Sequence, residues 1–205
     1  LLPLRAADRV FPTAHAFRRF LQRQLPAHLA QAPAADPLSR ARLPACPAVS
    51  REVARRWPAA SPELLAGGAS ALAALPIDHS VPVCETTGGP AAAEKALRRF
   101  LDAHLAGYAL ARNHPDDDAT SCLSPYLHHG HISVHRVLAG LAAREGWTPD
   151  RVGGAAGGSR QGWWGMSPDA EAFLDQLVTW RELGYNMAWQ RKDFDGYESL
   201  PDWAR

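Results

Sequence analysis

The chain has 205 residues, 46% hydrophobic and 21% charged, a composition that excludes a disordered protein. Twenty arginines, two lysines and 21 acidic residues give a formal charge of +1, so any contact with nucleic acid must use a local basic patch. The three cysteines are odd in number and widely spaced, which argues against a secreted disulfide framework and favours the cytoplasm. No apolar run approaches the ~18 residues of a membrane span, and the first residues lack a signal-peptide pattern.

The first predicted helix covers residues 14–29, where apolar residues repeat at helical spacing. These apolar residues are Phe17, Phe20, Leu21 and Leu25. Its arginines lie elsewhere on the circumference, and we expect Arg18, Arg19 and Arg23 on a solvated face. Residues 31–62 are rich in Ala and Pro, which predicts a linker with short helical turns.

A short helix is expected at 62–66, closed by Gly67 and Gly68. A longer helix is predicted after Pro90, because apolar residues recur at three- and four-residue intervals as far as Tyr108, and its continuation contains Arg112. Taken alone, Tyr108 would be read as a core tyrosine with its hydroxyl satisfied.

The segment TSCLSPYLHHGHIS, residues 120–133, combines hydroxyl side chains with a helix start. Ser124 is predicted as the N-cap and Pro125 as the first helical residue. The free backbone N–H groups of such a start, together with the hydroxyls of Thr120 and Ser121, would suit a diphosphate. Most Ser-Pro helix starts bind no ligand, so this chemistry alone is weak evidence.

Two groups of polar residues before and after this start are not expected to bind a metal. Asp116, Asp117 and Asp118 are consecutive, and consecutive carboxylates do not converge on one ion without a dedicated loop. His131 and His135 are four residues apart, but no second ligand cluster with zinc spacing accompanies them. We therefore predict no metal site.

A helix is predicted at 133–145, followed by a flexible glycine-rich loop at 153–162. The adjacent tryptophans Trp163 and Trp164 are expected to anchor that loop to the core. The last long helix is predicted at 168–189, with Gln176 one turn before Trp180. Its expected apolar stripe comprises Phe173, Leu177, Trp180, Gly184 and Met187.

The order of these motifs resembles the photolyase and cryptochrome family, most closely class II cyclobutane-pyrimidine-dimer photolyases. The resemblance rests on LAGYALARNHPDDDATSCLSPYLHHGHIS and FLDQLVTWRELGYNM, and it covers residues from about 81 to 205. It implies a mainly α fold: a helical FAD-binding domain, of which 90–205 would be the N-terminal half. Residues 1–30 are interpreted as the end of an α/β antenna domain, and 31–89 as the linker with short helices.

The resemblance also implies roles for individual residues. Tyr108, Thr120, Ser121, Leu123 and Ser124 match positions that hold the flavin nucleotide. Arg112 matches a position that faces DNA phosphate, and Trp180 and Arg181 are DNA-binding candidates. Gln176 and Trp180 are the catalytic candidates, at the pocket between flavin and a flipped-out lesion. FAD is the implied cofactor, with a second antenna chromophore in an N-terminal region, and ultraviolet-damaged DNA is the implied partner of a monomer.

One departure from the family pattern concerns Gln176, because classical cyclobutane-dimer photolyases have a glutamate there. A glutamine forms hydrogen bonds but cannot exchange a proton as a carboxylic acid does. The implied activity is that of a deoxyribodipyrimidine photolyase, a carbon–carbon lyase driven by light. Two alternatives stay open: a cryptochrome-like blue-light sensor, and a noncatalytic remnant. The start without methionine and the end after PDWAR predict a segment of a longer protein.

Overall fold

The computed structural model describes residues 1–39, 41–82 and 84–205, and these described residues contain helices and no strands. The mainly α fold class predicted from the sequence is thereby confirmed. The α-helices are α1 (Ala14–Gln24), α2 (Pro26–Leu29), α3 (Arg51–Arg56), α4 (Pro62–Leu65), α5 (Ala69–Ala73), α6 (Pro90–Arg99), α7 (Tyr108–Ala111), α8 (Ser124–His128), α9 (Val134–Glu145), α10 (Pro168–Leu174) and α11 (Arg181–Gln190). Two π-helical segments are η2 (Phe100–His104) and η4 (Asp175–Trp180), and the 3₁₀ turns are η1 (Leu4–Ala6), η3 (Pro149–Arg151), η5 (Tyr197–Ser199) and η6 (Asp202–Ala204).

The chain forms two compact units, which are described separately. The main unit consists of Leu1–Pro33 and Gly88–Arg205, and the inserted unit consists of Ala34–Thr87. The inserted unit contains only α3, α4 and α5, and none of its described residues is buried. The division into 1–30, 31–89 and 90–205, with an antenna-domain origin for the first part, stays a prediction.

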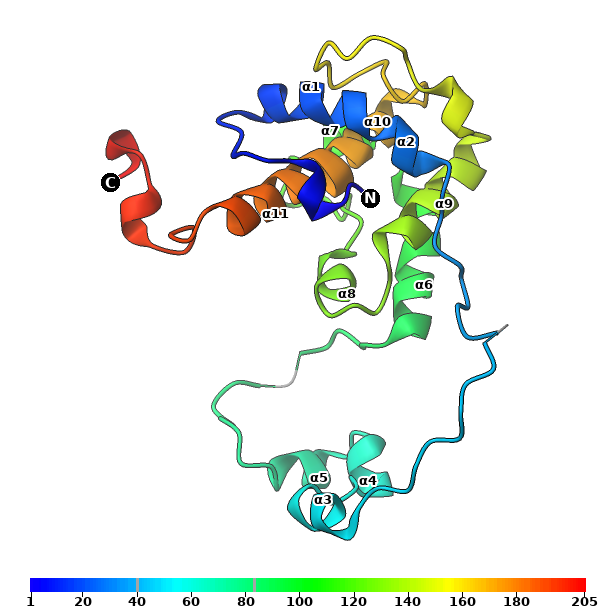
Figure 1. Ribbon diagram of the computed structural model, residues 1–205, viewed down its shortest axis with the longest axis vertical. Helices are drawn as coiled ribbons and strands as arrows, with labels where there is room; N and C mark the ends of the chain where they lie inside the picture. Colours follow the sequence, from blue (N-terminus) through cyan, green and yellow to red (C-terminus); the bar gives the residue numbers. More distant parts are fainter. Residues whose placement is uncertain (40, 83) are drawn as a thin grey trace. The chain divides into compact units, whose positions relative to one another are not determined.

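The core of the main unit is built around the run α10–η4–α11, which is continuous from Pro168 to Gln190 (Figure 1). α1 packs against η4, and α7 packs against α10. The fully buried side chains at the centre come from six elements, α1, α6, η2, α9, α10 and η4, and from the residue before α8. They are Phe17, Leu21, Leu97, Phe100, Leu123, Leu141, Leu174 and Val178. The helix predicted at 168–189 is confirmed, although its middle is a π-helical turn.

The helix predicted after Pro90 differs from the structure in its second half. α6 passes into η2, and the chain then turns at Gly107, which has φ +86°, before α7 begins at Tyr108. Arg112 follows α7 directly as its C-cap residue. A glycine permits this left-handed turn at little steric cost, and the turn sets Tyr108 at the start of a new helix.

Two other expectations concern the solvent exposure of side chains. Trp163 and Trp164 are both buried and meet edge to face at 5.0 Å, so their predicted role as loop anchors is confirmed. Arg18 was expected on a solvated face and is buried, because Asp175 of η4 lies opposite it. A helical repeat shows which positions are apolar, and it cannot show that an arginine has a buried partner.

Candidate functional site

A cavity of about 560 Å³ lies in the main unit, within the usual size range of small-molecule sites. One wall comes from the segment between α7 and the end of α8, and the other from α10, η4 and α11. The lining residues are Tyr108, Thr120, Ser121, Cys122, Ser124, Leu127, His128, Phe173, Gln176, Leu177, Arg181 and Tyr185. Six predicted site residues are therefore brought together: Tyr108, Thr120, Ser121, Ser124, Gln176 and Arg181.

The hydroxyl loop, residues 120–124, has an unusual backbone at its centre. Cys122 has φ +53°, and it is the only residue other than glycine with a positive φ among the described residues. Such a conformation is costly for a side chain with a Cβ and is found often at functional sites. The turn at Cys122 leaves the side chains of Thr120, Ser121 and Ser124 along the cavity.

Ser124 does not act as the predicted N-cap. α8 begins at Ser124 itself, Leu123 is the cap residue, and no side-chain cap is formed at this start within the described part of the chain. Ser124 therefore lines the cavity, and its side chain does not cap α8. The start was predicted within one residue, which is the usual uncertainty of helix ends.

Leu123 is a predicted cofactor residue whose side chain is not in the cavity. It is only 1% exposed and belongs to the core. Its backbone N–H donates to Ser121 Oγ at 3.4 Å, and its carbonyl accepts from the N–H of Leu127 at 2.9 Å. Leu123 thus fixes the hydroxyl loop to the core from behind.

Tyr108 is held from three sides. Its ring meets Phe100 at 5.5 Å and Phe173 at 5.6 Å, both edge to face, a favourable aromatic geometry. Asp169 of α10 accepts from the backbone N–H groups of Gly107 and Ala109 at 2.9 and 2.8 Å, and so caps the start of α7. Burial raises the pKa of Tyr108, an effect that the neighbouring Arg112 opposes.

Arg112 does not line the cavity. Its guanidinium carbon lies 5.9 Å from the Tyr108 ring centroid, and its charge opposes the rise of the Tyr108 pKa. Its Nε is buried and has no hydrogen-bond partner among the described residues. The DNA-phosphate role predicted for Arg112 stays a prediction.

The second wall depends on the π-helical turn η4. Gln176 and Leu177 come from this turn, and Arg181 and Tyr185 from the first two turns of α11. The Arg181 guanidinium lies 4.7 Å from the Tyr185 ring centroid, and it forms an ion pair with Glu182 at 3.3 Å. Arg181 is consequently a cation held at the cavity edge.

Trp180 is a predicted site residue that the structure does not bring to the cavity. It is 51% exposed and is not part of the lining. The expected apolar stripe is therefore wrong at Trp180, and also at Gly184, which is exposed. The cause is the wider π-helical turn, which shifts the register of a regular 3.6-residue helix after Leu177.

Sequence reasoning missed several lining residues and one supporting residue. The missed lining residues include Cys122, Phe173, Leu177 and Tyr185. Of these, only Tyr185 had a sequence signal, because it lies four residues after Arg181 and so on the same face of a helix. Asp169 had no sequence indication, because its partners lie 60 and 62 residues earlier.

The charges of the lining favour an anionic or neutral ligand. No aspartate or glutamate is among the described lining residues, whereas Arg181 is. Searching the described ranges finds no group of three or more His, Cys, Asp or Glu suited to a metal ion. His131 instead accepts a hydrogen bond from the N–H of Gly89 at 3.1 Å. In the described part of the chain, no helix is long and apolar enough to cross a membrane.

Comparison with known proteins agrees with the family resemblance found in the sequence motifs. No family model matches the chain. A deoxyribodipyrimidine photo-lyase from Potorous tridactylus is 30% identical over 134 residues, which is 65% of this chain and 22% of the relative. One from Oryza sativa subsp. japonica is 32% identical over 107 residues, 52% of this chain and 18% of the relative. One from Methanothermobacter thermautotrophicus is 29% identical over 118 residues, 58% of this chain and 21% of the relative.

The aligned part of the chain thus spans about a fifth of the length of these curated relatives. The matches do not distinguish the class II type from other photolyases. The four relatives share the name deoxyribodipyrimidine photo-lyase, and the helical fold and the residues gathered around the cavity agree with that likeness. Together these observations support membership of the photolyase family.

Proposed function

We propose that the chain forms part of an FAD site in a photolyase-type flavoprotein that repairs pyrimidine dimers in DNA. One observation supports this most: the hydroxyl loop and Tyr108 open into the same cavity as Gln176 and Arg181. The relatives are named deoxyribodipyrimidine photo-lyases, and this supports a light-driven lyase reaction as the proposed activity.

The donor set of the cavity fits the nucleotide part of FAD. Its diphosphate is anionic, and the cavity offers the hydroxyls of Tyr108, Thr120, Ser121 and Ser124, with no carboxylate among the described lining residues. Hydrogen bonds to a charged group are each worth about 1.5–3 kcal/mol. Leu123 would hold the loop in place through its buried side chain and its backbone.

The remaining proposed roles belong to the second wall and to the surface. The one-electron photochemistry is supplied by bound, reduced FAD, whereas the protein supplies binding and orientation. Gln176 lies in the same cavity as the hydroxyl loop, and its amide would hydrogen-bond both the bound flavin and the polar edges of a flipped pyrimidine pair. Trp180 is exposed, so we propose that it meets DNA bases by stacking, with Arg181 and Arg112 at phosphates.

The first test measures FAD retention by the purified chain. The protein is mixed with excess FAD, desalted, and its absorbance spectrum recorded. We expect blue-absorbing flavin to remain with the wild-type chain and to be lost from the double variant Ser121→Ala/Ser124→Ala. The matched control is Ser50→Ala/Ser61→Ala, which removes two serines of the inserted unit that cap α3 and α4. A folded wild-type chain that retains no flavin would refute the proposed site.

The second test concerns the substrate. A repair protein should bind ultraviolet-irradiated DNA more tightly than intact DNA, because a lesion lowers the cost of flipping its bases out of the stack. Equal binding to irradiated and intact duplexes of one sequence, in one salt concentration, would contradict the repair function. That outcome would leave a light-sensing role as the function to examine.

A further inference from the structure

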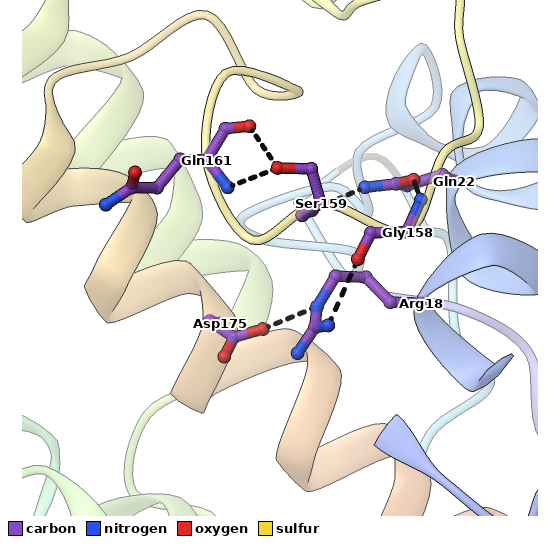
Figure 2. A network of polar contacts seen from close by, with 6 residues as sticks. All are labelled: Arg18, Gln22, Gly158, Ser159, Gln161 and Asp175. Atoms are coloured by element: carbon purple, nitrogen blue, oxygen red, sulfur yellow. Dashed lines mark hydrogen bonds and ion pairs between the residues drawn. The ribbon is translucent and has the colours of Figure 1, made fainter. Parts of the chain in front are cut away.

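A buried ion pair lies directly behind the cavity wall. Arg18 of α1 donates from Nε to Asp175 Oδ1 at 2.9 Å, and the two side chains are 8% and 6% exposed (Figure 2). A second guanidinium nitrogen of Arg18 donates to the carbonyl of Gly158 at 3.2 Å. Asp175 is the first residue of η4, and its neighbour Gln176 lines the cavity.

The same network ties the glycine-rich loop to α1. Gln22, one turn after Arg18, accepts from the N–H of Gly158 at 2.7 Å and donates to the carbonyl of Ser159 at 2.9 Å. Ser159 in turn accepts from the N–H of Gln161 at 3.2 Å (Figure 2). The sequence predicted a flexible loop, and at Gly158 and Ser159 the loop is instead hydrogen-bonded to buried side chains of α1.

Gly158 permits this attachment. It has φ +82°, and a Cβ added there would lie 2.6 Å from Cγ of Arg19 and 2.8 Å from Cε1 of His15. Only a glycine allows the loop backbone to approach α1 so closely. Three parts of the chain, α1, the loop and η4, therefore meet at Arg18.

Stability alone is a poor explanation for this pair. Apolar residues of similar volume often replace a buried ion pair with no loss of stability, because burying two charges is costly. A π-helical turn is also rare and occurs frequently at functional sites. Here the pair holds the first residue of such a turn, and neither member of the pair lines the cavity.

We propose that Arg18 and Asp175 form a positioning pair, which holds η4 in the register that directs Gln176 into the cavity. The inference rests on the proposed FAD site for its ligand, and on the structure for its geometry. Neither Arg18 nor Asp175 lines the cavity, so the pair acts on the ligand through the position of Gln176. Loss of the pair should let η4 relax towards a regular α-helix, which would turn Gln176 away.

The test replaces both members together, because a single replacement would leave an unpaired buried charge. The double variant Arg18→Met/Asp175→Leu should keep its melting temperature and lose about tenfold in FAD affinity, measured by quenching of flavin fluorescence. In a Gln176→Ala background the same double replacement should cause no further loss. The conservative variant Arg18→Gln/Asp175→Asn, which can keep the hydrogen bond without charge, should recover most of the affinity. The control Glu94→Leu/Arg136→Met removes an exposed ion pair of α6 and α9 and should leave affinity unchanged.

A second measurement does not depend on flavin. Amide hydrogen exchange of peptides covering residues 170–190 should rise about tenfold in the Arg18→Met/Asp175→Leu variant and stay unchanged in the control. Unchanged exchange in η4, or an affinity loss that persists fully in the Gln176→Ala background, would overturn the positioning role. If the wild-type chain binds no FAD, the proposed function fails, and the exchange result still decides whether the pair holds the turn.

Discussion

Tyr108 shows how a single residue serves both the core and the cavity. Its ring packs between Phe100 and Phe173, while the side chain also lines the cavity. From its position in the sequence it could be read as an ordinary core tyrosine, and the structure shows that packing and exposure to the cavity coexist. Its ring and its hydroxyl can therefore be tested separately.

Replacing Tyr108 by Phe removes the hydroxyl and keeps the ring. We expect FAD affinity to fall about ten- to a hundredfold, the effect of one hydrogen bond to a charged group, with little change in packing. Flavin fluorescence titration measures the affinity. The control is Tyr197→Phe, which removes an exposed hydroxyl that donates to the carbonyl of Arg205, away from the cavity lining. Equal affinities for the wild-type protein and the Tyr108 variant would show that this hydroxyl does not contact the ligand.

The raised pKa of Tyr108 predicts a specific pH dependence of stability. Burial keeps the proton on the folded tyrosine to a higher pH than on the unfolded one. Above pH ~10 the folded state therefore binds more protons, and the free energy of unfolding falls as pH rises. Urea denaturation between pH 9 and pH 11 should show a shallower decline for Tyr108→Phe than for wild type. If the free energy of unfolding declines in parallel for the two proteins, groups other than Tyr108 cause the loss of stability.

At the scale of elements, the start of α7 depends on a carboxylate from another helix. Asp169 accepts from two backbone N–H groups that flank Tyr108 along the chain. Replacing Asp169 by Ala should lower the free energy of unfolding by about 0.5–2 kcal/mol, the usual effect of losing a helix cap. It should also weaken FAD binding, because the start of α7 sets the position of Tyr108.

Ser133→Ala is the matched control for this cap, since Ser133 caps α9 by accepting from the N–H of Arg136 at 3.1 Å. Urea denaturation and flavin titration are measured on both variants. We expect similar losses of stability and a loss of affinity only for Asp169→Ala. Unchanged affinity in that variant would mean that α7 does not need its cap to present Tyr108.

The helices were predictable from the sequence where one local rule determined them. Apolar periodicity predicted the helices at 133–145 and 168–189, and Gly67, with φ +70°, ends the short helix at 62–65 as expected. The π-helical turn η4 was not predictable, since its register depends on packing and on the buried partner of Asp175. The exposure of Trp180 and the burial of Arg18 both follow from that turn and that partner.

The sequence predicted many of the residues of the candidate site, and it predicted their positions in the site less well. The motif order identified Tyr108, Thr120, Ser121, Ser124, Gln176 and Arg181, and all six line one cavity. The same motif reasoning could not distinguish a residue that lines the cavity from one that supports it. Leu123 was therefore predicted together with the lining residues, although its side chain is buried in the core. Asp169 and Arg18 act over long sequence separations, and no local pattern indicates such partners.

For the whole molecule, the division into two units separates the proposed site from the inserted unit. Every residue that lines the cavity belongs to the main unit. The inserted unit contributes no buried residue among those described, and its exposed apolar side chains include Trp57 and Leu65. Its three short helices consequently add little to the hydrophobic stabilisation of the fold.

Removing most of the inserted unit tests this independence. Residues 38–84 are replaced by a flexible Gly/Ser linker of about 20 residues. The entropic cost of closing this loop differs little from that of the full chain, because the cost depends only on the logarithm of loop length. We expect a cooperative thermal transition within about 2 °C of the full chain, followed by circular dichroism, and unchanged flavin retention. Gly158→Ala provides the contrast, because its Cβ would strike Arg19 and His15 and should lower the melting temperature. If the deletion lowers the melting temperature as much as Gly158→Ala does, the inserted unit takes part in the stability of the main unit.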